Sequence, residues 1–265
     1  MNTNQPLLIL GLALKASKNG IFYYNYLFKR NEVNAIYRSC PIVSLESFRC
    51  AIEFLDVYAA SIAAPYKIKI IEKIDSLTEV SKITKSVNCI KRIDNKIQGH
   101  NTDALGLINI FKEQIETFEK NPSFLIYGTG GVVPSIVYAL NVVFNKPLIY
   151  ISGRNNLKVN KISKELNLNI ITNPSDISVS LWINATPVSI NNPEKILEIS
   201  SNSSAVFDLN PIQEQYEFEL QIKERNQKFI RGFDFYIEQF IEQYLFFVGK
   251  KITKNQIKGI INEYK

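Results

Sequence analysis

A lysine and a carboxylate can together carry out proton transfer, and the chain has many of both, Lys67 and Asp103 among them. Moving a hydride to or from a ring carbon leaves an alkoxide or a carbonyl oxygen that must gain or lose a proton, and a lysine ammonium can supply it. A carboxylate beside the lysine would orient the ammonium, bind a neighbouring hydroxyl and favour the charged lysine. Taken separately, each residue is more typical of a solvated charge at the start of a helix, so catalysis requires that the fold bring them together.

A glycine-rich turn could bind a phosphate group. Residues 124–127 predict a buried strand, residues 128–131 read Gly-Thr-Gly-Gly, and residues 132–140 predict an amphipathic helix. The first glycine would allow a tight turn, and the next would let the backbone approach a pyrophosphate that accepts from N–H groups at the helix N-terminus. A Gly-x-Gly-Gly also occurs in ordinary turns between a strand and a helix, but the flanking elements favour a dinucleotide site. Its predicted binding residues are Gly128, Thr129, Gly130 and Gly131.

The residue type after the next predicted strand indicates which dinucleotide binds. NAD enzymes commonly place a carboxylate there, about 20 residues after the glycines, whereas an arginine there pairs with the 2′-phosphate of NADP. This chain has Arg154 at that point, and Lys158 stands one turn into the following helix. A solvated surface arginine is the alternative interpretation. The pattern predicts NADP as the cofactor.

These residues belong to a chain in which short apolar runs alternate with longer amphipathic segments. The alternation predicts an α/β fold with largely parallel strands, because parallel strands need a crossover that a helix usually supplies. Helical patterns cover residues 102 to 119, 235–248 and 254–264, and residues 87–97 resemble a hairpin. The predicted strands are Leu7–Gly11, Ala35–Tyr37, Ala59–Ala63, Phe124–Tyr127, Leu148–Ile151, Leu181–Asn184 and Ala205–Asp208.

Two domains follow from the chain length and from the change of pattern near Asn101. The 265 residues exceed the roughly 100–200 residues of a usual single core. We expect a substrate-binding catalytic domain of residues 1–101 and 235–265, in which the C-terminal helices pack back on the first segment. Residues 102–234 are expected to form a Rossmann-like, doubly wound NADP-binding domain.

Charge and composition narrow the class of ligand. The 31 basic and 25 acidic residues give a net charge of +6 without a basic stripe, which suits a small anionic ligand and argues against nucleic acid. Three scattered cysteines and a single histidine support neither a disulfide framework nor a metal site. The N-terminus lacks the basic region of a secretory signal and no apolar run is long enough to span a bilayer, so we expect a cytoplasmic protein without a membrane partner. Monomer and homodimer both stay open.

Several sequence blocks resemble the shikimate dehydrogenase family. The most specific is Asn101–Gly106, which is similar to the Asn-Thr-Asp-x-x-Gly signature of the family, and the resemblance runs from about Leu8 to Gly249. It implies reversible reduction of 3-dehydroshikimate to shikimate by NADPH, a step of aromatic amino-acid (chorismate) biosynthesis. The other similar blocks are Ala64–Lys67, Ser86–Cys89, Ile183–Pro187 and Gly232–Gln239.

The resemblance also implies roles for individual residues. By position, Lys67 and Asp103 match the catalytic pair of the family. The matching binding residues are Asn88 and Gln239 for the substrate hydroxyls, Ser17 at its carboxylate, and Thr186 at the cofactor. Asn19 stands at the place of a second carboxylate-binding serine and could still donate from its amide.

The chain departs from the family at the carboxylate end of the implied pocket. Asn19 replaces a serine, Ala63 replaces a threonine, and the tyrosine expected before Asn210-Pro211 is missing. Gly153 and Ser189 also stand where the family usually has asparagine and glycine. Three alternatives stay open: shikimate dehydrogenase itself, a relative acting on another hydroxylated ring acid such as quinate or an aminoshikimate, and a non-catalytic NADP-binding paralogue.

Overall fold

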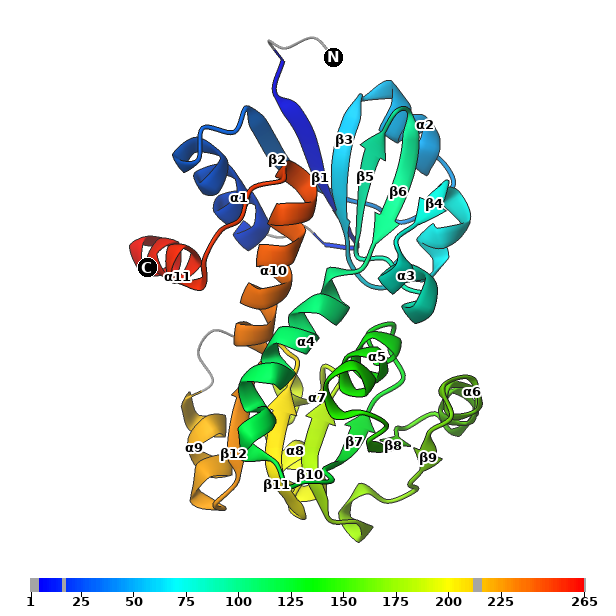
Figure 1. Cartoon of the computed structure of the whole chain (residues 1–265), viewed down its shortest axis with the longest axis vertical. Helices are drawn as coiled ribbons and strands as arrows, with labels where there is room; N and C mark the ends of the chain where they lie inside the picture. The colour runs from blue at the N-terminus through cyan, green and yellow to red at the C-terminus, as the bar shows by residue number, and fades with distance from the viewer. Residues whose placement is uncertain (1–4, 16–17, 212–215, 265) are drawn as a thin grey trace. The chain divides into compact units, whose positions relative to one another are not determined.

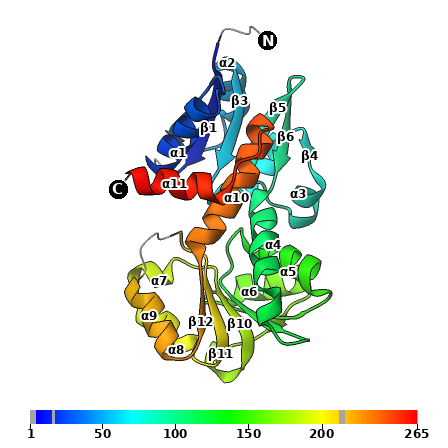
Figure 2. The same cartoon turned by 60° about the vertical axis from the view of Figure 1, so that its left-hand side comes forward.

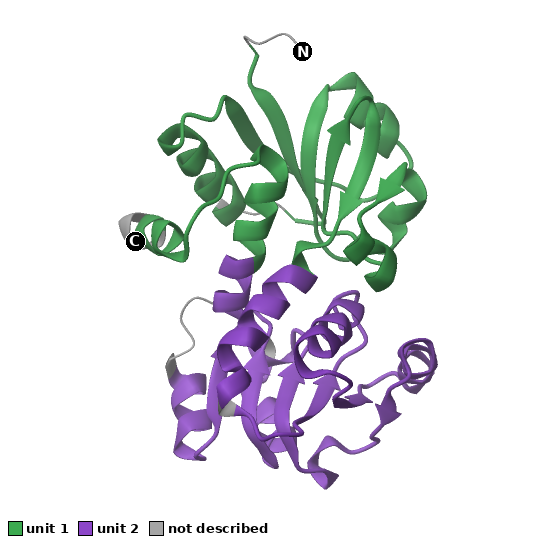
Figure 3. Ribbon diagram, viewed as in Figure 1, with its two compact units in different colours: residues 1–103, 239–265 green, residues 104–238 purple. Residues whose placement is uncertain are grey.

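The computed structural model of the chain describes residues 5–15, 18–211 and 216–264 (Figure 1). The chain divides into two compact units, and each is described by itself. Unit 1 comprises residues 1–103 and 239–265, and unit 2 comprises residues 104–238 (Figure 3). Each unit contains a sheet with helices, so the predicted α/β class is confirmed. The assignment of one unit to a substrate and the other to NADP stays a prediction.

Unit 1 is built on a mixed sheet. Its described part contains six strands in the order β2-β1-β3-β5-β6-β4. The strand β1 pairs in parallel with β2 and β3, whereas β5 is antiparallel to β3 and β6. The strands are β1 (Leu7–Ala13), β2 (Ala35–Pro41), β3 (Val57–Ile62), β4 (Ser76–Leu77), β5 (Cys89–Ile93) and β6 (Lys96–His100). The helices within this segment are α1 (Lys18–Arg30), α2 (Phe48–Phe54) and α3 (Glu79–Thr84), with a 3₁₀ helix at Lys69–Lys73.

The pattern of residues 87–97 predicted a hairpin, and β5 and β6 form it. Asp94 and Asn95 connect the strands with φ angles of 48° and 62°. Asn and Asp tolerate this left-handed conformation, and two consecutive positive φ angles are typical of a two-residue hairpin turn. The turn fixes the register in which Cys89 pairs with His100. The hairpin therefore delivers the chain directly to Asn101–Asp103.

Unit 2 is built on a wholly parallel sheet. Its described strands lie in the order β12-β11-β10-β7-β8-β9, which is the doubly wound order with β7 as its first strand. The strands are β7 (Ser123–Tyr127), β8 (Leu148–Ser152), β9 (Asn169–Ile170), β10 (Val179–Asn184), β11 (Ser203–Asp208) and β12 (Lys228–Arg231). The helices are α4 (Thr102–Gln114), α5 (Val133–Phe144), α6 (Asn156–Leu166), α7 (Val188–Asn191), α8 (Pro193–Ile199) and α9 (Tyr216–Glu224).

The central strand β7 is apolar along its length because both faces of the sheet are covered. Phe124 and Ile126 lie in a core cluster with residues of α4 and α5. Leu125 and Tyr127 point the other way, into a cluster with residues of α8 and α9. Successive side chains of a strand alternate between faces, so a strand between two helical layers reads as a continuous apolar run. This burial holds the residues that follow β7 in place.

The helix α10 (Gly232–Val248) begins in unit 2 and ends in unit 1. In unit 2, Glu238 accepts a hydrogen bond from Asn109 of α4 at 3.0 Å, and the two helices run side by side there (Figures 1 and 2). In unit 1, the Tyr24 ring of α1 lies 4.4 Å from that of Phe240. The helix α11 (Lys254–Tyr264) also belongs to unit 1. The prediction that the C-terminal helices return to the first segment is confirmed.

The predicted helix from residue 102 to 119 was too long. α4 ends at Gln114 and is followed by a 3₁₀ turn at Ile115–Thr117. Phe118 then takes extended angles, and its ring lies 6.0 Å from that of Phe124 and 5.8 Å from that of Phe144. Packing of this ring in the core of unit 2 requires the chain to leave the helix, which the helical periodicity did not reveal. None of the helices in the described ranges is long and apolar enough to cross a membrane.

The single histidine, His100, lies at the end of β6, where its ring stacks on Phe246 at 4.6 Å and its Nδ1 lies 2.8 Å from Thr78 Oγ1. Burial lowers the pKa of His100 to about 4.

The folded protein binds this proton less readily than the unfolded chain does. Its free energy of unfolding therefore decreases as the pH is lowered from about 6.5 to about 4. We expect a loss of up to about 1.4 kcal/mol per pH unit in that window and none from this group above it. Urea unfolding at several pH values measures the slope. In His100→Asn the slope is expected to be shallower, and an unchanged slope would remove His100 as its cause.

Candidate active site

Lys67 and Asp103, which are 36 positions apart, form an ion pair in unit 1. Lys67 follows the end of β3, and its carbonyl accepts from the backbone N–H of Val87 at 2.8 Å. Asp103 lies in the first turn of α4, where the free N–H groups of the helix favour a carboxylate. Lys67 Nζ lies 2.6 Å from Asp103 Oδ2, and the two side chains are 20% and 5% exposed. The fold therefore places the predicted proton donor beside the carboxylate predicted to orient it.

The side chain of Asn88 contacts the other oxygen of Asp103. Its Nδ2 donates to Asp103 Oδ1 at 2.9 Å and to Thr102 Oγ1 at 2.8 Å, and lies 3.4 Å from Gln239 Oε1. Its Oδ1 accepts from the backbone N–H of Thr102 at 2.8 Å. Both oxygens of the Asp103 carboxylate thus accept hydrogen bonds, which suits an ionised group that can only accept. The structure brings Lys67, Asn88, Asp103 and Gln239 together within unit 1.

Of the two residues expected to bind the substrate carboxylate, the structure describes only Asn19. Ser17 lies outside the described residues. Asn19 is exposed at the start of α1, where its amide is accessible. Ala63 follows β3, is exposed, and its N–H donates to the carbonyl of Leu12 at 2.9 Å. Tyr23, which lies four residues after Asn19 on α1, is 2% exposed and its ring packs edge-on against Phe240.

The glycine turn after β7 has a backbone that only glycine adopts without strain. Gly128 has a φ of +137°, and its N–H donates to the carbonyl of Ser152 at 2.9 Å. A Cβ atom at Gly128 would lie 2.7 Å from the carbonyl oxygen of Ala185. Gly130 is exposed, and a Cβ atom there would meet nothing closer than 3.9 Å. The first glycine is thus needed for the turn itself, and the third position of the turn leaves room for a ligand.

The turn lies at the point where the strand order of unit 2 reverses. β7 and β10 are neighbours, the chain from β7 leads outward to β8 and β9, and the chain from β10 leads the other way to β11 and β12. Gly128 follows β7, and Thr186 lies two residues beyond β10. Ligands of open α/β sheets bind outside the carboxyl ends of the strands at such a reversal. The glycine turn and Thr186 therefore lie where a dinucleotide is expected.

Arg154 and Lys158 lie at the carboxyl end of β8, the strand next to β7. Both side chains are exposed, and neither forms an ion pair with a carboxylate among the described residues. Asn155 caps α6 by accepting from the N–H of Lys158 at 3.0 Å. The cap fixes the start of the helix, with Arg154 directly before the cap and Lys158 in the first turn after it. Their cationic groups are accessible to a phosphate.

A polar cluster that the sequence did not reveal holds the segment after β10. Asn184 is fully buried, and its Oδ1 accepts from the hydroxyl of Thr186 at 2.7 Å. Asn210 Nδ2 lies 2.7 Å from Ser189 Oγ, 2.7 Å from Asp208 Oδ1 and 2.8 Å from the carbonyl of Thr186. Ser189 was noted only as a departure from the family pattern, and Asn210 only as marking the place of a missing tyrosine. Both therefore help to anchor Thr186. The contacts connect residues up to 24 positions apart, so spacing gave no signal for them.

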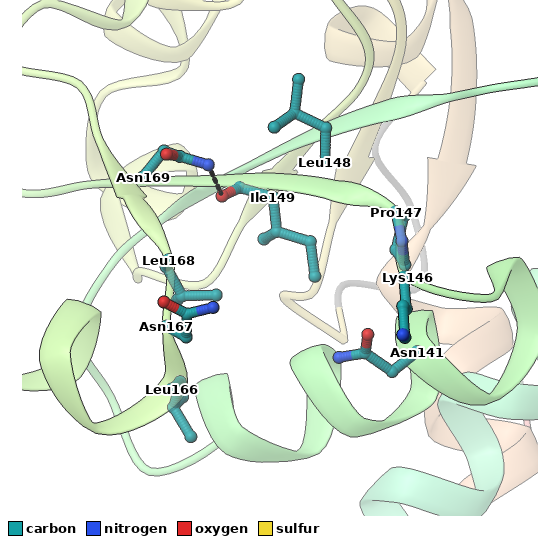
Figure 4. Close-up of a pocket in the computed structure, with 9 residues that line it drawn as sticks. All are labelled: Asn141, Lys146, Pro147, Leu148, Ile149, Leu166, Asn167, Leu168 and Asn169. Carbon is teal, nitrogen blue, oxygen red and sulfur yellow. Dashed lines mark hydrogen bonds between the residues drawn. The ribbon is translucent and has the colours of Figure 1, made fainter.

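A cavity of about 520 Å³ lies at the amino ends of β8 and β9 in the sheet of unit 2 (Figure 4). Its lining combines Lys146 and asparagine side chains with apolar residues at the start of β8, such as Leu148. Because it lies at the amino ends of the strands, it is separate from the glycine turn. None of the predicted site residues lines it.

The chain is similar to known proteins in sequence and in structure, whereas no protein-family model matches it. Shikimate dehydrogenase (NADP(+)) of Pelagibacter ubique strain HTCC1062 is 33% identical over 192 residues, which are 71% of this chain and 71% of that protein. The solved shikimate dehydrogenase of Aquifex aeolicus has a TM-score of 0.83 and 23% identity, covering 98% of this chain and 99% of that one. The 5-ketofructose reductase of Gluconobacter sp. strain CHM43 has a TM-score of 0.79 and 17% identity, covering 99% and 100%. At these identities the two solved structures establish a shared fold and not a shared reaction.

Proposed function

Because this chain belongs to the shikimate dehydrogenase family, we propose that it reversibly reduces 3-dehydroshikimate to shikimate with NADPH. The observation that carries the proposal is the Lys67–Asp103 pair, joined to Asn88 and Gln239 in unit 1. Membership of the family makes the chain an NADP-dependent oxidoreductase, and the identity of its substrate is the proposal. A place in aromatic amino-acid biosynthesis follows only if the substrate is 3-dehydroshikimate.

NADPH, when bound, supplies the hydride that the carbonyl carbon accepts. The ammonium of Lys67 then donates its proton to the carbonyl oxygen, which becomes the hydroxyl group. Because the Lys67 side chain is 20% exposed, it can regain a proton from solvent. In the reverse direction the neutral amine accepts the hydroxyl proton as the hydride leaves. Asp103 keeps Nζ oriented toward the reacting oxygen and offers its carboxylate to an adjacent hydroxyl.

Asn88 and Gln239 are proposed to bind the ring hydroxyls. Both carry amide groups that donate and accept. In unit 1 they contact one another, and Asn88 also contacts Asp103. A substrate hydroxyl that enters this cluster would exchange a contact between protein groups for one of its own. Such a site favours a polyhydroxylated ring, because an analogue without the hydroxyl would leave a buried amide less well paired.

The residues of unit 2 fit the proposed cofactor. The turn of Gly128, Thr129, Gly130 and Gly131 leaves open space at Gly130, and α5 begins directly after it. A pyrophosphate would accept from backbone N–H groups at this helix start. Arg154 and Lys158 would bind the 2′-phosphate, and Thr186, fixed by Asn184 and Asn210, would contact the nicotinamide side.

Arg154→Ala is expected to weaken NADP binding by roughly 10- to 100-fold while leaving NAD binding unchanged. A lost charge-assisted contact to a phosphate costs about 1.5–3 kcal/mol, and NAD has no 2′-phosphate to lose. Titration of both cofactors into wild type and variant measures this difference. Lys164→Ala, an exposed lysine near the end of the same α6 helix, is the matched control and should change neither affinity. Equal binding of both cofactors, unaffected by Arg154→Ala, would contradict the assignment.

A second candidate is a dehydrogenase of another hydroxylated ring acid, such as quinate or an aminoshikimate. It is favoured by the carboxylate end of the site, where Ala63 supplies no hydroxyl and Asn19 is an exposed amide. Turnover of shikimate, quinate and amino-substituted analogues, followed by NADPH absorbance, separates the two. Turnover of shikimate at least as efficient as that of the analogues supports the first proposal. NADP binding without turnover of any of them indicates a non-catalytic paralogue.

A further inference from the structure

Gln243 is a buried polar residue on α10 to which the proposed mechanism gives no part. It lies one helical turn after Gln239 and is 5% exposed. Residues four apart on a helix share a face, so Gln239 and Gln243 point toward the same part of unit 1. A buried glutamine amide must have partners for its N–H and C=O groups, because leaving them unpaired is costly. Its partners therefore indicate what it does.

Both ends of the Gln243 amide have specific partners. Its Oε1 accepts from the hydroxyl of Tyr24 on α1 at 2.6 Å, and its Nε2 donates to the backbone carbonyl of Asn88 at 3.2 Å. The Asn88 carbonyl fixes which way the amide points, since a carbonyl can only accept and must therefore face Nε2. Tyr24 is itself held, with its ring stacked on that of Tyr37 at 4.5 Å. Gln243 therefore connects a rigid aromatic cluster to the backbone of Asn88.

Asn88 is the residue on which the two glutamines of α10 converge. Gln239 contacts the side chain of Asn88, whereas Gln243 contacts its carbonyl, which also accepts from the N–H of Ile62 at 2.7 Å. The side chain of Asn88 in turn donates to Asp103. A shift of the Asn88 backbone would move its amide away from Asp103 and loosen the carboxylate that orients Lys67.

We propose that Gln243 is a positioning residue of the active site, which fixes Asn88 through its carbonyl and thereby holds Asp103 and Lys67 in the geometry for proton transfer. It acts through Asn88 and does not touch the substrate. The consequence for catalysis rests on the proposed function, whereas the consequence for the Asn88 side chain does not.

The first test compares Gln243→Leu with Tyr244→Phe, a matched control on the same helix. Tyr244 is buried and its hydroxyl accepts from Asn31 at 3.0 Å. The control therefore also loses a part-buried hydrogen bond, and this bond does not involve Asn88. We expect Gln243→Leu to lower kcat with shikimate on the order of 10- to 100-fold, the effect of a small misplacement of reacting groups. NADP affinity should stay unchanged in both variants, and Tyr244→Phe should keep wild-type kcat.

The second test uses Gln243→Glu, which has nearly the same shape. A neutral glutamic acid can donate to the Asn88 carbonyl and accept from Tyr24, whereas the carboxylate can only accept. The ratio of its kcat to that of wild type should therefore fall as pH rises through the titration of the new group. The ionisable groups Tyr24, Cys89, Asp103 and Lys67 are present in both proteins, so wild type is the reference at each pH. A pH-independent ratio would overturn the proposal.

A third measurement does not depend on turnover. The side-chain amide resonances of Asn88, followed by NMR, should shift in Gln243→Leu and, to a smaller degree, in Tyr24→Phe, but not in Tyr244→Phe. If no ring acid is turned over while these shifts occur, the proposed function fails and the positioning of Asn88 by Gln243 stands. If wild type is active and Gln243→Leu matches Tyr244→Phe in kcat and in the Asn88 resonances, the inference is wrong. Should Gln243→Leu not fold, Gln243→Glu and Tyr24→Phe give the same two outcomes.

Discussion

Lys67→Ala is expected to lower kcat for the proposed ring-acid substrate by about 10²–10⁴-fold, the usual contribution of a positioned proton donor. The methyl group of alanine cannot reach the carbonyl oxygen, and solvent protonates the alkoxide without orientation. Because Nζ makes its 2.6 Å contact within unit 1, NADP affinity should stay near the wild-type value. Steady-state kinetics give kcat, and energy transfer from Trp182, the only tryptophan in the chain, to NADPH gives the affinity.

Two further variants separate proton transfer from loss of charge. Lys69→Ala removes an exposed lysine two positions away and should leave kcat unchanged. Asp103→Asn keeps the shape of the side chain and the contact with Asn88 but weakens the orientation of Lys67, so its kcat should fall less than that of Lys67→Ala. An ordinary kcat in Lys67→Ala would remove lysine from the mechanism and leave it a surface charge.

Gly128→Ala is expected to weaken NADP binding by about 100-fold and to lower the free energy of unfolding by about 2–4 kcal/mol. The φ of +137° is strained for any residue with a Cβ atom, and that atom would lie 2.7 Å from the carbonyl oxygen of Ala185. Relief of the contact requires the turn or the segment before Thr186 to move. Either shift displaces the N–H groups at the start of α5 from the pyrophosphate.

Gly259→Ala is the matched control, because it makes the same chemical change at an exposed position of α11, where a Cβ atom meets nothing within 4 Å. It should raise the free energy of unfolding by about 0.5–1 kcal/mol and leave NADP binding unchanged. Calorimetry of cofactor binding and urea unfolding of both variants give the two quantities. A Gly128→Ala protein with wild-type affinity would show that this turn does not bind the cofactor.

Local sequence patterns were sufficient for most of the secondary structure. The strand predicted at Phe124–Tyr127 is present as β7 because alternate side chains, such as Phe124 and Leu125, reach two separate cores, which makes the whole strand apolar. The glycine turn and the hairpin were also predictable, since positive φ angles restrict the residue types that a turn accepts. The edge strand β12 was not predicted, because Lys228–Arg231 has a charged residue at each end and pairs only with β11.

The tertiary structure alone decided the composition of the site. Composition and spacing could not bring Lys67 to Asp103 across 36 positions, and only family resemblance singled the pair out before the fold joined them. Gln243 meets the Asn88 carbonyl across 155 positions, and no residue near Gln243 in the sequence hints at that partner. The physical reason is that hydrogen bonds and turn angles act between neighbours in the chain, whereas contacts between distant side chains depend on how sheets and helices pack. The sequence by itself determined which elements form and which residues could do chemistry, and the packing of α10 and the β5–β6 hairpin in unit 1 decided which of those residues meet.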